Sequence, residues 1–404
     1  EVLSSQRTIT VTGTGSISVD NDHRSIYGDT SGEIADFTIT NAGAVLNSGA
    51  EGEGIELDAD EAVTRNTIVN SGEITSEGND GIFIYSSSSA ITLNNIENRG
   101  VITAGDEGIQ LETVFAEDGD GIPLSPSNRI IANNTITNSG SIVADQDGIY
   151  VESDGDFTGN TISNTGSIRS DEEGIDIDLG GYFDLGVGSA TGNRITNSGT
   201  IVSEDDAIEV TTNYFFNGNT IENTGSLTSE TDDVINVDGD SGVTGNRIVN
   251  FGQMIAENED GFDIGSSAGH ITANEFVNAA GGTITSAESA ISITSTGDIN
   301  SNAVRNHGNL VVTGDFDPEA TDETLDDASG IALFIDDDED GEILNNAIEN
   351  TGSIDAGVMG IAVITADGLI DGNDITNSGD ITSGFDGISV LASLGDVNDN
   401  NVTN

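Results

Sequence analysis

The chain has 404 residues and a formal net charge of −63, because 72 acidic side chains stand against only nine basic ones, all of them arginine. A charge of this size argues against nucleic acid and anionic membranes as partners, since both are bound through positive patches, and it favours cations. The absence of cysteine excludes disulfides and thiolate metal sites. No apolar run approaches the roughly 20 residues of a membrane span, so no direct membrane insertion is expected.

The first segment, residues 1–36, lacks the repeat that follows it. Ile9, Val11, Ile17 and Val19 alternate with Thr and Ser, as half-buried strands do. We therefore expect residues 1–36 to form an atypical N-terminal coil or cap over the core of a repeat domain. The first twelve residues, EVLSSQRTITVT, lack the basic and then apolar regions of an export signal, so an exported protein would have lost its signal before Glu1.

From residue 37 to residue 404 one motif recurs, and a clear copy is the segment 134–151, NTITNSGSIVADQDGIYV. Its three pieces hold aliphatic side chains spaced by two and are bounded by Gly, Asn or Asp, a pattern typical of short strands joined by tight turns. Nine of the twelve gaps between copies are 26 to 29 residues long, which predicts one solenoid domain. The second Asn of the first piece marks the copies: Asn41, Asn70, Asn98, Asn138, Asn164, Asn197, Asn223, Asn250, Asn278, Asn306, Asn350, Asn377 and Asn404.

Stacking of equivalent strands at about 4.8 Å predicts an all-β fold, a parallel β-helix with three short strands per coil and about 12 to 13 coils. Three aliphatic columns are expected to fill its core, through Ile136, Ile142 and Ile149 and their equivalents in the other repeats. The marker Asn lies two positions from the inward Ile, so we expect the Asn amides of successive coils to form a hydrogen-bonded ladder. The glycine that follows the marker is expected to allow a positive φ at the corner.

The repeat TITNSGSI…DGI resembles, over residues 37–404, the right-handed parallel β-helix passenger domains of bacterial autotransporters and related large surface adhesins. The resemblance implies a right-handed solenoid, secretion to the extracellular space or the cell surface, and a structural or adhesive role. The extreme acidity of this chain departs from the family pattern.

Three inserted loops are expected where the repeat is longest, near residues 113–129, 180–188 and 313–328. In solenoids, such insertions mark the face on which specific binding is built. The sequence stops in the middle of a repeat at Asn404. We therefore expect either a fragment of a longer chain or a unit whose end is covered by another copy, which would assemble end to end into a fibre.

Acidic residues gather immediately before the third strand of most repeats, and stacking turns them into a ribbon of carboxylates along one edge. Because an inward column of carboxylates is costly to desolvate, we expect most of them to face water. A coil stack about 60 Å long carries roughly one net charge per Å, a higher density than the one charge per about 1.7 Å of duplex DNA. The charge therefore requires a saline medium, such as that around a marine or halophilic bacterium, or bound divalent cations; a merely solvated acidic surface is the alternative.

Three acidic stretches offer only oxygen ligands, which predicts Ca²⁺ in preference to transition metals. The sharpest candidate is the segment DDDEDG at 336–341, which matches the opening of a calcium-binding loop with Gly at its sixth position. Ala347 stands at the twelfth position, where that loop has Glu, so a neighbouring turn must supply a ligand. The candidate ligands are Asp336, Asp338 and Asp340, followed by Asp118 with Asp120 and Asp238 with Asp240.

The alternative function is a polysaccharide-active enzyme, because the coil also resembles that of pectin-degrading hydrolases and lyases. The pairs Asp205–Asp206 and Asp232–Asp233 offer the two carboxylates of acid–base catalysis. However, the three histidines fall at unrelated points of the repeat, no lysine is present, and an anionic polymer would be repelled. We therefore predict a non-enzymatic protein that binds divalent cations and whose partner is either other copies of itself, end to end, or cell-surface or matrix polysaccharide.

Two further groups of residues have predicted roles. Arg65, Arg194, Arg247 and Arg305 lie on or beside the first strand and are expected to pair with acidic residues of adjacent turns. The segment Tyr214–Phe216 either packs as a small apolar cluster under the turn or stacks on sugars or another chain.

Overall fold

The computed structural model describes residues 8–20, 23–50, 52–113, 129–180, 188–314, 328–335 and 341–404. The predicted loops near 113–129, 180–188 and 313–328 lie almost entirely outside these ranges. The chain divides into two compact units, Glu1–Ser203 with Glu209–Asn213, and Glu204–Ile208 with Tyr214–Asn404. In the described ranges no helix has the length and apolar character needed to cross a membrane.

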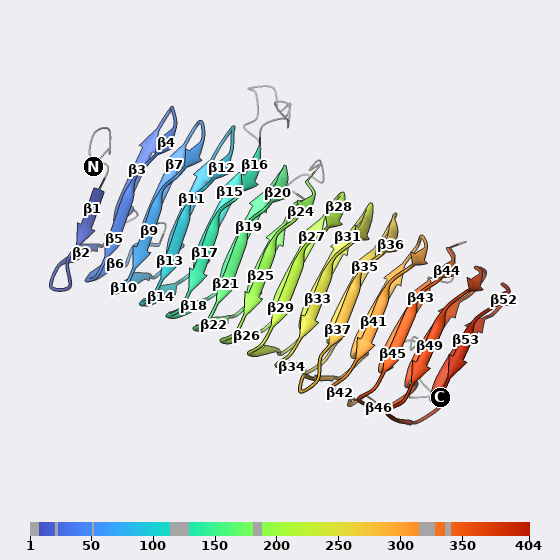
Figure 1. The fold of residues 1–404 in the computed structure, drawn as a ribbon. Helices are drawn as coiled ribbons and strands as arrows, with labels where there is room; N and C mark the ends of the chain where they lie inside the picture. Colours follow the sequence, from blue (N-terminus) through green and yellow to red (C-terminus); the bar gives the residue numbers. More distant parts are fainter. Residues whose placement is uncertain are drawn as a thin grey trace. The chain divides into compact units, whose positions relative to one another are not determined.

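The fold is an all-β solenoid of about 13 windings, and a full winding contributes one strand to each of four parallel sheets, here called A to D (Figure 1). Sheets A, B and C are formed by the three strands that the sequence predicts in each repeat. The fourth strand, only two or three residues long, lies between the strand after the Asp-Gly corner and the next Asn-bearing strand. A piece this short contains a single inward residue, such as Ile91, so alternation in the sequence does not reveal it.

Sheet A is built from the strands that carry the marker Asn. In unit 1 these are β1 (Thr8–Val11), β5 (Thr38–Asn41), β9 (Thr67–Asn70), β13 (Asn95–Asn98), β17 (Thr135–Asn138), β21 (Thr161–Asn164) and β25 (Arg194–Asn197). In unit 2 they are β29 (Thr220–Asn223), β33 (Arg247–Asn250), β37 (Glu275–Asn278), β41 (Ala303–Asn306), β45 (Ala347–Asn350), β49 (Asp374–Asn377) and β53 (Asn401–Thr403).

Sheet B follows the Asn corner. In unit 1 its strands are β2 (Ser16–Val19), β6 (Ala44–Asn47), β10 (Glu73–Ser76), β14 (Val101–Ala104), β18 (Ser141–Ala144), β22 (Ser167–Ser170) and β26 (Thr200–Ser203). In unit 2 they are β30 (Ser226–Ser229), β34 (Gln253–Ala256), β38 (Thr283–Ser286), β42 (Asn309–Val312), β46 (Ser353–Ala356) and β50 (Asp380–Ser383).

Sheet C follows the acidic corner. In unit 1 its strands are β3 (Ile26–Thr30), β7 (Ile55–Ala59), β11 (Ile82–Ser86), β15 (Ile109–Thr113), β19 (Ile149–Ser153), β23 (Ile175–Asp178) and, from its second residue on, β27 (Ile208–Thr212). In unit 2 they are β31 (Ile235–Gly239), β35 (Phe262–Ser266), β39 (Ile291–Ser295), β43 (Ile331–Ile335), β47 (Ile361–Thr365) and β51 (Ile388–Ala392).

Sheet D closes each winding. In unit 1 its strands are β4 (Ile34–Ala35), β8 (Val63–Thr64), β12 (Ile91–Thr92), β16 (Ile130–Ala132), β20 (Asp156–Thr158) and β24 (Ala190–Thr191). In unit 2 they are β28 (Phe215–Asn217), β32 (Gly242–Thr244), β36 (His270–Thr272), β40 (Ile299–Asn300), β44 (Ile343–Leu344), β48 (Ile370–Asp371) and β52 (Val397–Asn398).

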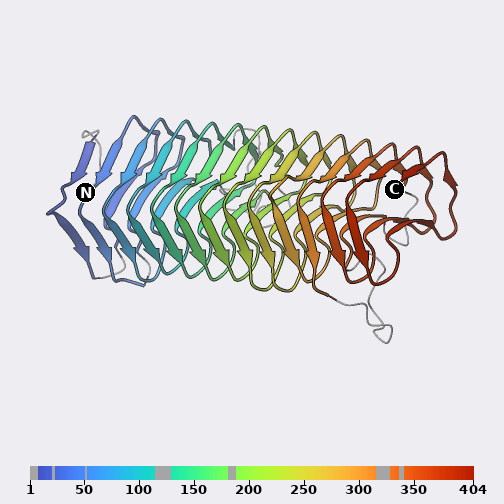
Figure 2. The same ribbon diagram turned by 60° about the horizontal axis from the view of Figure 1, so that its bottom comes forward.

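Equivalent residues of successive windings pair in register. Figure 2 shows the parallel strands of successive windings within each unit. Ile68, Ile96 and Ile136 are consecutive partners in sheet A, and all three are buried. The expected aliphatic columns are thus confirmed. The N-terminal segment also joins the stack: β1 to β4 pair with β5 to β8, with Thr8 opposite Thr38 and Ile26 opposite Ile55.

The marker asparagines form the predicted ladder at the corner between sheets A and B, here called the first amide ladder. The side-chain N–H of Asn98 donates to the Oδ1 of Asn138 at 2.8 Å, and that of Asn138 donates to Asn164 at 2.8 Å. All three side chains are fully buried. The ladder therefore satisfies polar groups that the core would otherwise leave without partners.

A second amide ladder, which the sequence reasoning missed, occupies the corner between sheets D and A. The Nδ2 of Asn94 donates to Asn134 Oδ1 at 3.0 Å, and Asn134 donates in turn to Asn160 at 3.0 Å. The backbone N–H of Asn94 donates to the same Asn134 oxygen, at 2.9 Å. The residue before each rung has a positive φ, such as Leu93 at 59° and Asn133 at 56°.

The expected positive φ at the glycine after the marker Asn is wrong. Gly140 does not have a positive φ; a Cβ there would lie 2.0 Å from the carbonyl oxygen of Gly100 in the preceding winding. Glycine is needed at this corner because two backbones approach each other closely. Positive φ occurs instead at the residue before the second amide ladder, where Gly192 has a φ of 65° and open space around its Cα.

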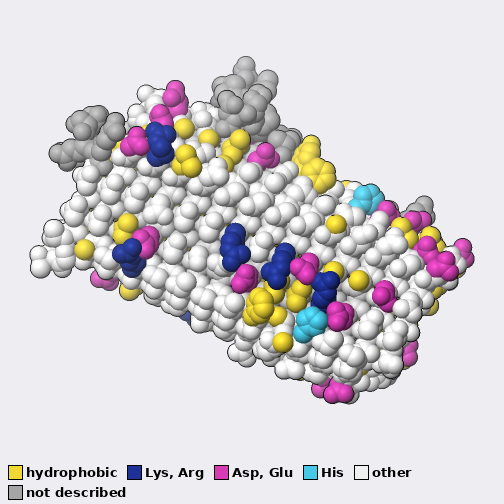
Figure 3. All heavy atoms as spheres, viewed as in Figure 1, with side chains coloured by type: hydrophobic (Ala, Val, Ile, Leu, Met, Phe, Trp, Pro, Cys, Tyr) yellow, Lys and Arg dark blue, Asp and Glu magenta, His cyan; other side chains and the backbone are white. Residues whose placement is uncertain are grey.

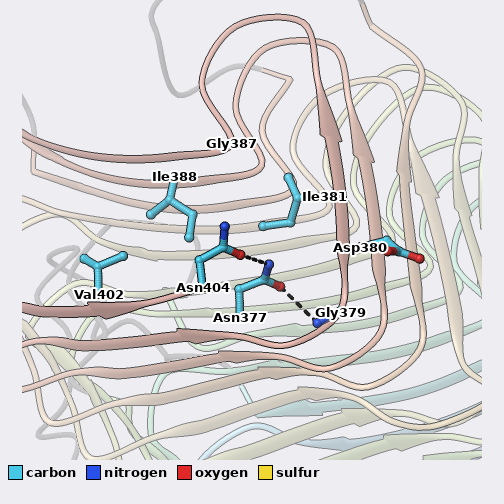
Figure 4. Close-up of a pocket in the computed structure, with 8 residues that line it drawn as sticks. All are labelled: Asn377, Gly379, Asp380, Ile381, Gly387, Ile388, Val402 and Asn404. Atoms are coloured by element: carbon cyan, nitrogen blue, oxygen red, sulfur yellow. Dashed lines mark hydrogen bonds between the residues drawn. The ribbon is translucent and has the colours of Figure 1, made fainter.

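Figure 4 shows the last winding of this sequence, where Asn377 donates to Asn404 and accepts from the backbone N–H of Gly379. The inward side chains Ile381, Ile388 and Val402 line a pocket there. These three residues lie on the last strands of sheets B, C and A in the printed sequence.

We predict that Gly140→Ala lowers the free energy of unfolding by about 3 kcal/mol, because the new methyl group forces two backbones apart. Gly192→Asn serves as the matched control. Asn133 already occupies the equivalent position at a φ of 56°, so this change is expected to cost less than about 1 kcal/mol. Urea unfolding followed by circular dichroism measures both values, and equal losses in the two variants would contradict the backbone-contact explanation.

Candidate functional site

The corner that leads from sheet B into sheet C carries one acidic side chain in each of a run of windings. The backbone N–H of Gly81, which follows Asp80, donates to the C=O of Glu107, and the N–H of Gly148 donates to the C=O of Glu173. Equivalent acidic residues are therefore stacked one above another. This carboxylate column consists of Glu53, Asp80, Glu107, Asp147 and Glu173 in unit 1 and of Asp206, Asp233 and Asp260 in unit 2.

Most acidic residues at this corner are exposed or half-exposed, as expected, but six of the eight residues of the carboxylate column are buried. The exposed fractions are 2% for Asp80, 5% for Asp147, 3% for Asp206 and 7% for Asp233. Their sequence neighbours Glu172 and Asp232 are exposed. The two kinds of position differ because the corner turns one side chain along the solenoid axis and the adjacent one outward.

Three of the four buried aspartates are held by the backbone of the next winding. Asp147 Oδ1 accepts the N–H of Glu173 at 2.9 Å, and Asp233 Oδ1 accepts the N–H of Asp260 at 2.8 Å. Asp80 makes the same contact with Glu107 at 3.2 Å. One carboxylate oxygen thus accepts a backbone N–H from a neighbouring winding, as the amide oxygen of Asn134 does in the second amide ladder. In Asp80 and Asp147 the carboxyl also meets the carboxyl of the next rung, which, when ionised, has no N–H to donate as an asparagine would.

Three clusters of carboxylates arise where a buried aspartate meets two consecutive acidic residues of the next winding. In each cluster, one ligand atom from every member lies within 4.8 Å of the others. We call them the first, second and third triads: Asp80 with Asp106 and Glu107; Asp147 with Glu172 and Glu173; and Asp206 with Asp232 and Asp233. These separations suit carboxylates that share a hard cation.

Burial, and then the neighbouring carboxylates, raise the pKa values of the buried aspartates Asp80, Asp147 and Asp233. The pKa of Asp80 lies well above its usual range, because the residue is buried and its carboxyl meets that of Glu107. Burial and the carboxyl of Glu173 raise the pKa of Asp147 to about 9, and burial with Asp263 raises that of Asp233 to about 8. At neutral pH the clusters must therefore hold protons or bind cations.

At the first rung, Glu53, the protein supplies the cation itself. Arg24 Nε lies 2.8 Å from Glu53 Oε2 and 2.5 Å from Glu56 Oε2. Asn79 Nδ2 donates to the other oxygen of Glu53 at 3.0 Å. Among the described residues no arginine forms an ion pair with Asp80 or Asp147. The charge compensation that Arg24 gives to Glu53 must come from elsewhere at those rungs.

The outer surface of sheet C continues the acidic region. Glu112 and Glu152 lie opposite each other on β15 and β19. Burial, and then the charge of Glu152, raises the pKa of Glu112 to about 8; burial, and then Asp178, raises that of Glu152 to about 7. Both carboxyls are half-buried. The region of unfavourable charge is therefore wider than the corner itself.

The calcium ligands predicted from the sequence are not the clustered ones. Asp336, Asp338, Asp340, Asp118 and Asp120 lie outside the described residues. Asp238 and Asp240 are described: Asp238 is half-buried near the end of β31, and Asp240 accepts a hydrogen bond from the hydroxyl of Ser267. The three triads found in the described part of the chain include neither of them.

Of the paired aspartates considered for catalysis, Asp206, Asp232 and Asp233 meet in the third triad, whereas Asp205 accepts a hydrogen bond from the Thr231 hydroxyl at 2.6 Å. The signal for the triads was present in the sequence as consecutive acidic residues before the third strand. What the sequence did not reveal was which member of each pair is buried.

The predicted pairing of arginines with acidic residues of adjacent turns is confirmed for three of the four. Arg65 lies 2.9 Å from Asp36, and Glu275 lies between Arg247 and Arg305, at 3.0 and 2.6 Å. Figure 3 shows arginines beside acidic side chains on a face that is otherwise mostly uncharged. This face, over sheet A, differs from the acidic corner.

The aromatic segment at 214–216 divides between the core and the surface. Phe216 is buried as the inward residue of β28, whereas Tyr214 and Phe215 are exposed and contact each other edge to face. The predicted apolar packing therefore holds for Phe216.

No protein-family model matches this sequence, and no curated protein and no solved structure resembles it at a significant level. The solenoid fold and the carboxylate geometry are therefore the observations on which a function can be argued.

We predict that, in metal-free buffer, the melting temperature falls as pH rises from 5 to 8.5, and that Glu112→Gln reduces this fall. The folded protein holds a proton on Glu112 up to about pH 8, whereas the unfolded chain releases it near pH 4.5, so stability is lost across this window. The carboxylates of Glu152, Glu107, Asp154 and Asp58 cause part of the shift.

Differential scanning calorimetry at several pH values tests this prediction. The control is Glu73→Gln, the same chemical change at an exposed position of β10. A pH dependence of the Glu112→Gln variant that matches the wild type would contradict the role of Glu112.

Proposed function

We propose that this chain is a non-enzymatic extracellular structural or adhesive protein, an acidic β-solenoid at the cell surface in which bound divalent cations, above all Ca²⁺, neutralise the carboxylate column. The observation that carries the proposal is the recurrence of three carboxylate triads at one corner of successive windings. A repeated structural position with a repeated charge favours a role in stabilising the solenoid over a role in one localised reaction.

Calcium suits these clusters better than other common ions. The triads offer only carboxylate oxygens, which hard cations prefer, and the chain has no cysteine. Ca²⁺ accepts six to eight oxygen ligands in flexible geometry, whereas Mg²⁺ requires a near-octahedral shell and retains its water. Carboxylates from two adjacent windings would thus be joined by the ion, and water would supply the other ligands.

A solenoid that depends on calcium fits an environment in which calcium is abundant. Extracellular modules bind Ca²⁺ with dissociation constants of about 10⁻⁴ to 10⁻³ M, whereas cytosolic sensors need far tighter sites. The resemblance of the repeat to autotransporter passengers and large surface adhesins supports the same location. The partners proposed with it are matrix or cell-surface polysaccharide and further copies of the chain.

We predict that removing calcium at low ionic strength destabilises the protein. Each site saturated at 100 times its dissociation constant contributes about 2.7 kcal/mol, so a melting curve with chelator should lie well below one with millimolar CaCl₂. Molar NaCl should restore part of the loss by screening the exposed charges. Identical melting temperatures with chelator and with calcium would disprove the cation part of the proposal.

The competing function is polysaccharide cleavage at the third triad, where Asp206 lies with Asp232 and Asp233. We expect no product from pectin-like or alginate-like polymers incubated with the calcium-loaded protein, measured as new reducing ends and as unsaturated sugars. Turnover that Asp233→Asn abolishes, in a variant that still folds, would replace the structural proposal with an enzymatic one.

A further inference from the structure

We propose that Asp176 completes a specific Ca²⁺ site with Asp147, Glu172 and Glu173. The inference rests on the proposed function, since it names one place where the cation binds and the residue that distinguishes it. All four side chains belong to unit 1, and they come from two adjacent windings.

Asp176 lies on β23, three residues after Glu173, and its side chain is on the outer surface of sheet C while Ile175 and Ile177 enter the core. Only 9% of Asp176 is exposed, and its Oδ1 makes no hydrogen bond. The charges that act on it most strongly are those of Glu209, Asp147 and Glu173, all of the same sign. A buried carboxylate oxygen in this setting requires a cation or a proton.

Comparison of the three triads shows why Asp176 is distinctive. The residue three positions after the column residue of the second winding is Gln110 in the first triad, Asp176 in the second and Asn236 in the third. Both amides donate hydrogen bonds to carboxylates: Gln110 Nε2 to Glu112 at 3.3 Å, and Asn236 Nδ2 to Asp206 at 3.3 Å. An ionised aspartate cannot donate. The second triad therefore has a further carboxylate, Asp176, at the position where the other two have an amide donor.

Three carboxylates whose ligand atoms lie within 4.8 Å of one another, with the charge of buried Asp176 acting on two of them, favour a divalent cation with several oxygen ligands. Asp147 uses one oxygen to accept the N–H of Glu173, which leaves its other oxygen for the metal. Glu172 is exposed, so the ion has a route from solvent. Buried Asp176 on one side and exposed Glu172 on the other would hold the ion at the surface of the corner, with water completing its coordination.

Tyr150 provides a reporter beside this site. It is the register partner of Asp176 on the neighbouring strand β19. The chain has five tyrosines and no tryptophan, so tyrosine is the principal donor for sensitised Tb³⁺ luminescence. Tb³⁺ replaces Ca²⁺ in oxygen-ligand sites because both are hard cations of similar size. Energy transfer from a ring this close makes binding at the proposed site visible.

The experiment titrates the full chain with Tb³⁺ and then displaces it with Ca²⁺, using four proteins. The wild type should show tyrosine-sensitised emission that Ca²⁺ removes. Asp176→Asn, which keeps the side-chain shape, should bind at least tenfold more weakly. Tyr150→Phe should lose most of the emission while its Ca²⁺ affinity by calorimetry is unchanged. Asp355→Asn, the same charge change at an exposed position of β46, should match the wild type.

The results separate this site from the proposed function. If calcium raises the melting temperature of the wild type but Asp176→Asn binds Tb³⁺ and Ca²⁺ as tightly as the wild type, the site assignment is wrong and cation binding elsewhere stands. If the wild type binds neither ion, both fail, and protons neutralise the second triad. Circular dichroism of Asp176→Asn confirms that weaker binding is not a loss of fold.

Discussion

The structure depends on the in-register stacking of successive windings. Backbone hydrogen bonds in four parallel sheets place each residue about 4.8 Å from its equivalent in the next winding. An asparagine hydrogen-bonds to the equivalent asparagine of the next winding, so this residue is stabilised at every rung. A carboxylate repels the equivalent carboxylate of the next winding, so this residue is destabilised at every rung. The amide ladders and the carboxylate column are the two outcomes of this one constraint.

Much of the fold could be predicted because stacked windings require similar residues at regular intervals, which makes the sequence repetitive. The columns through Ile136, Ile142 and Ile149 and the ladder through Asn138 followed from alternation and spacing. The fourth strand could not, since a piece such as Ile91–Thr92 is too short to alternate. The second amide ladder had a signal, the first Asn of Asn-x-Ile-x-Asn, but its role becomes clear only once the extra corner is known.

The acidic site shows where prediction from sequence ends. The positions of consecutive acidic residues were read correctly, and their stacking was expected. Their burial was not, because the sequence does not show whether Asp147 turns along the axis or outward. The cost of desolvating a carboxylate suggested exposure, yet a hydrogen bond from the next winding holds Asp80, Asp147 and Asp233 in place. Arg24 shows that the chain can neutralise such a carboxylate by itself, and does so at Glu53.

The constant separation of the two amide ladders has a consequence for how such a chain can vary. The paired rungs are four positions apart in short and long repeats alike, as in Asn66 and Asn70 or Asn346 and Asn350. From β9 to β53, each strand of sheet A is thus anchored at both ends, and none of the differences in repeat length fall there. Insertions and deletions are confined to the other three sides. Sheet A keeps a constant length in successive repeats, whereas the other three sides can change in length without disrupting the stacking of sheet A.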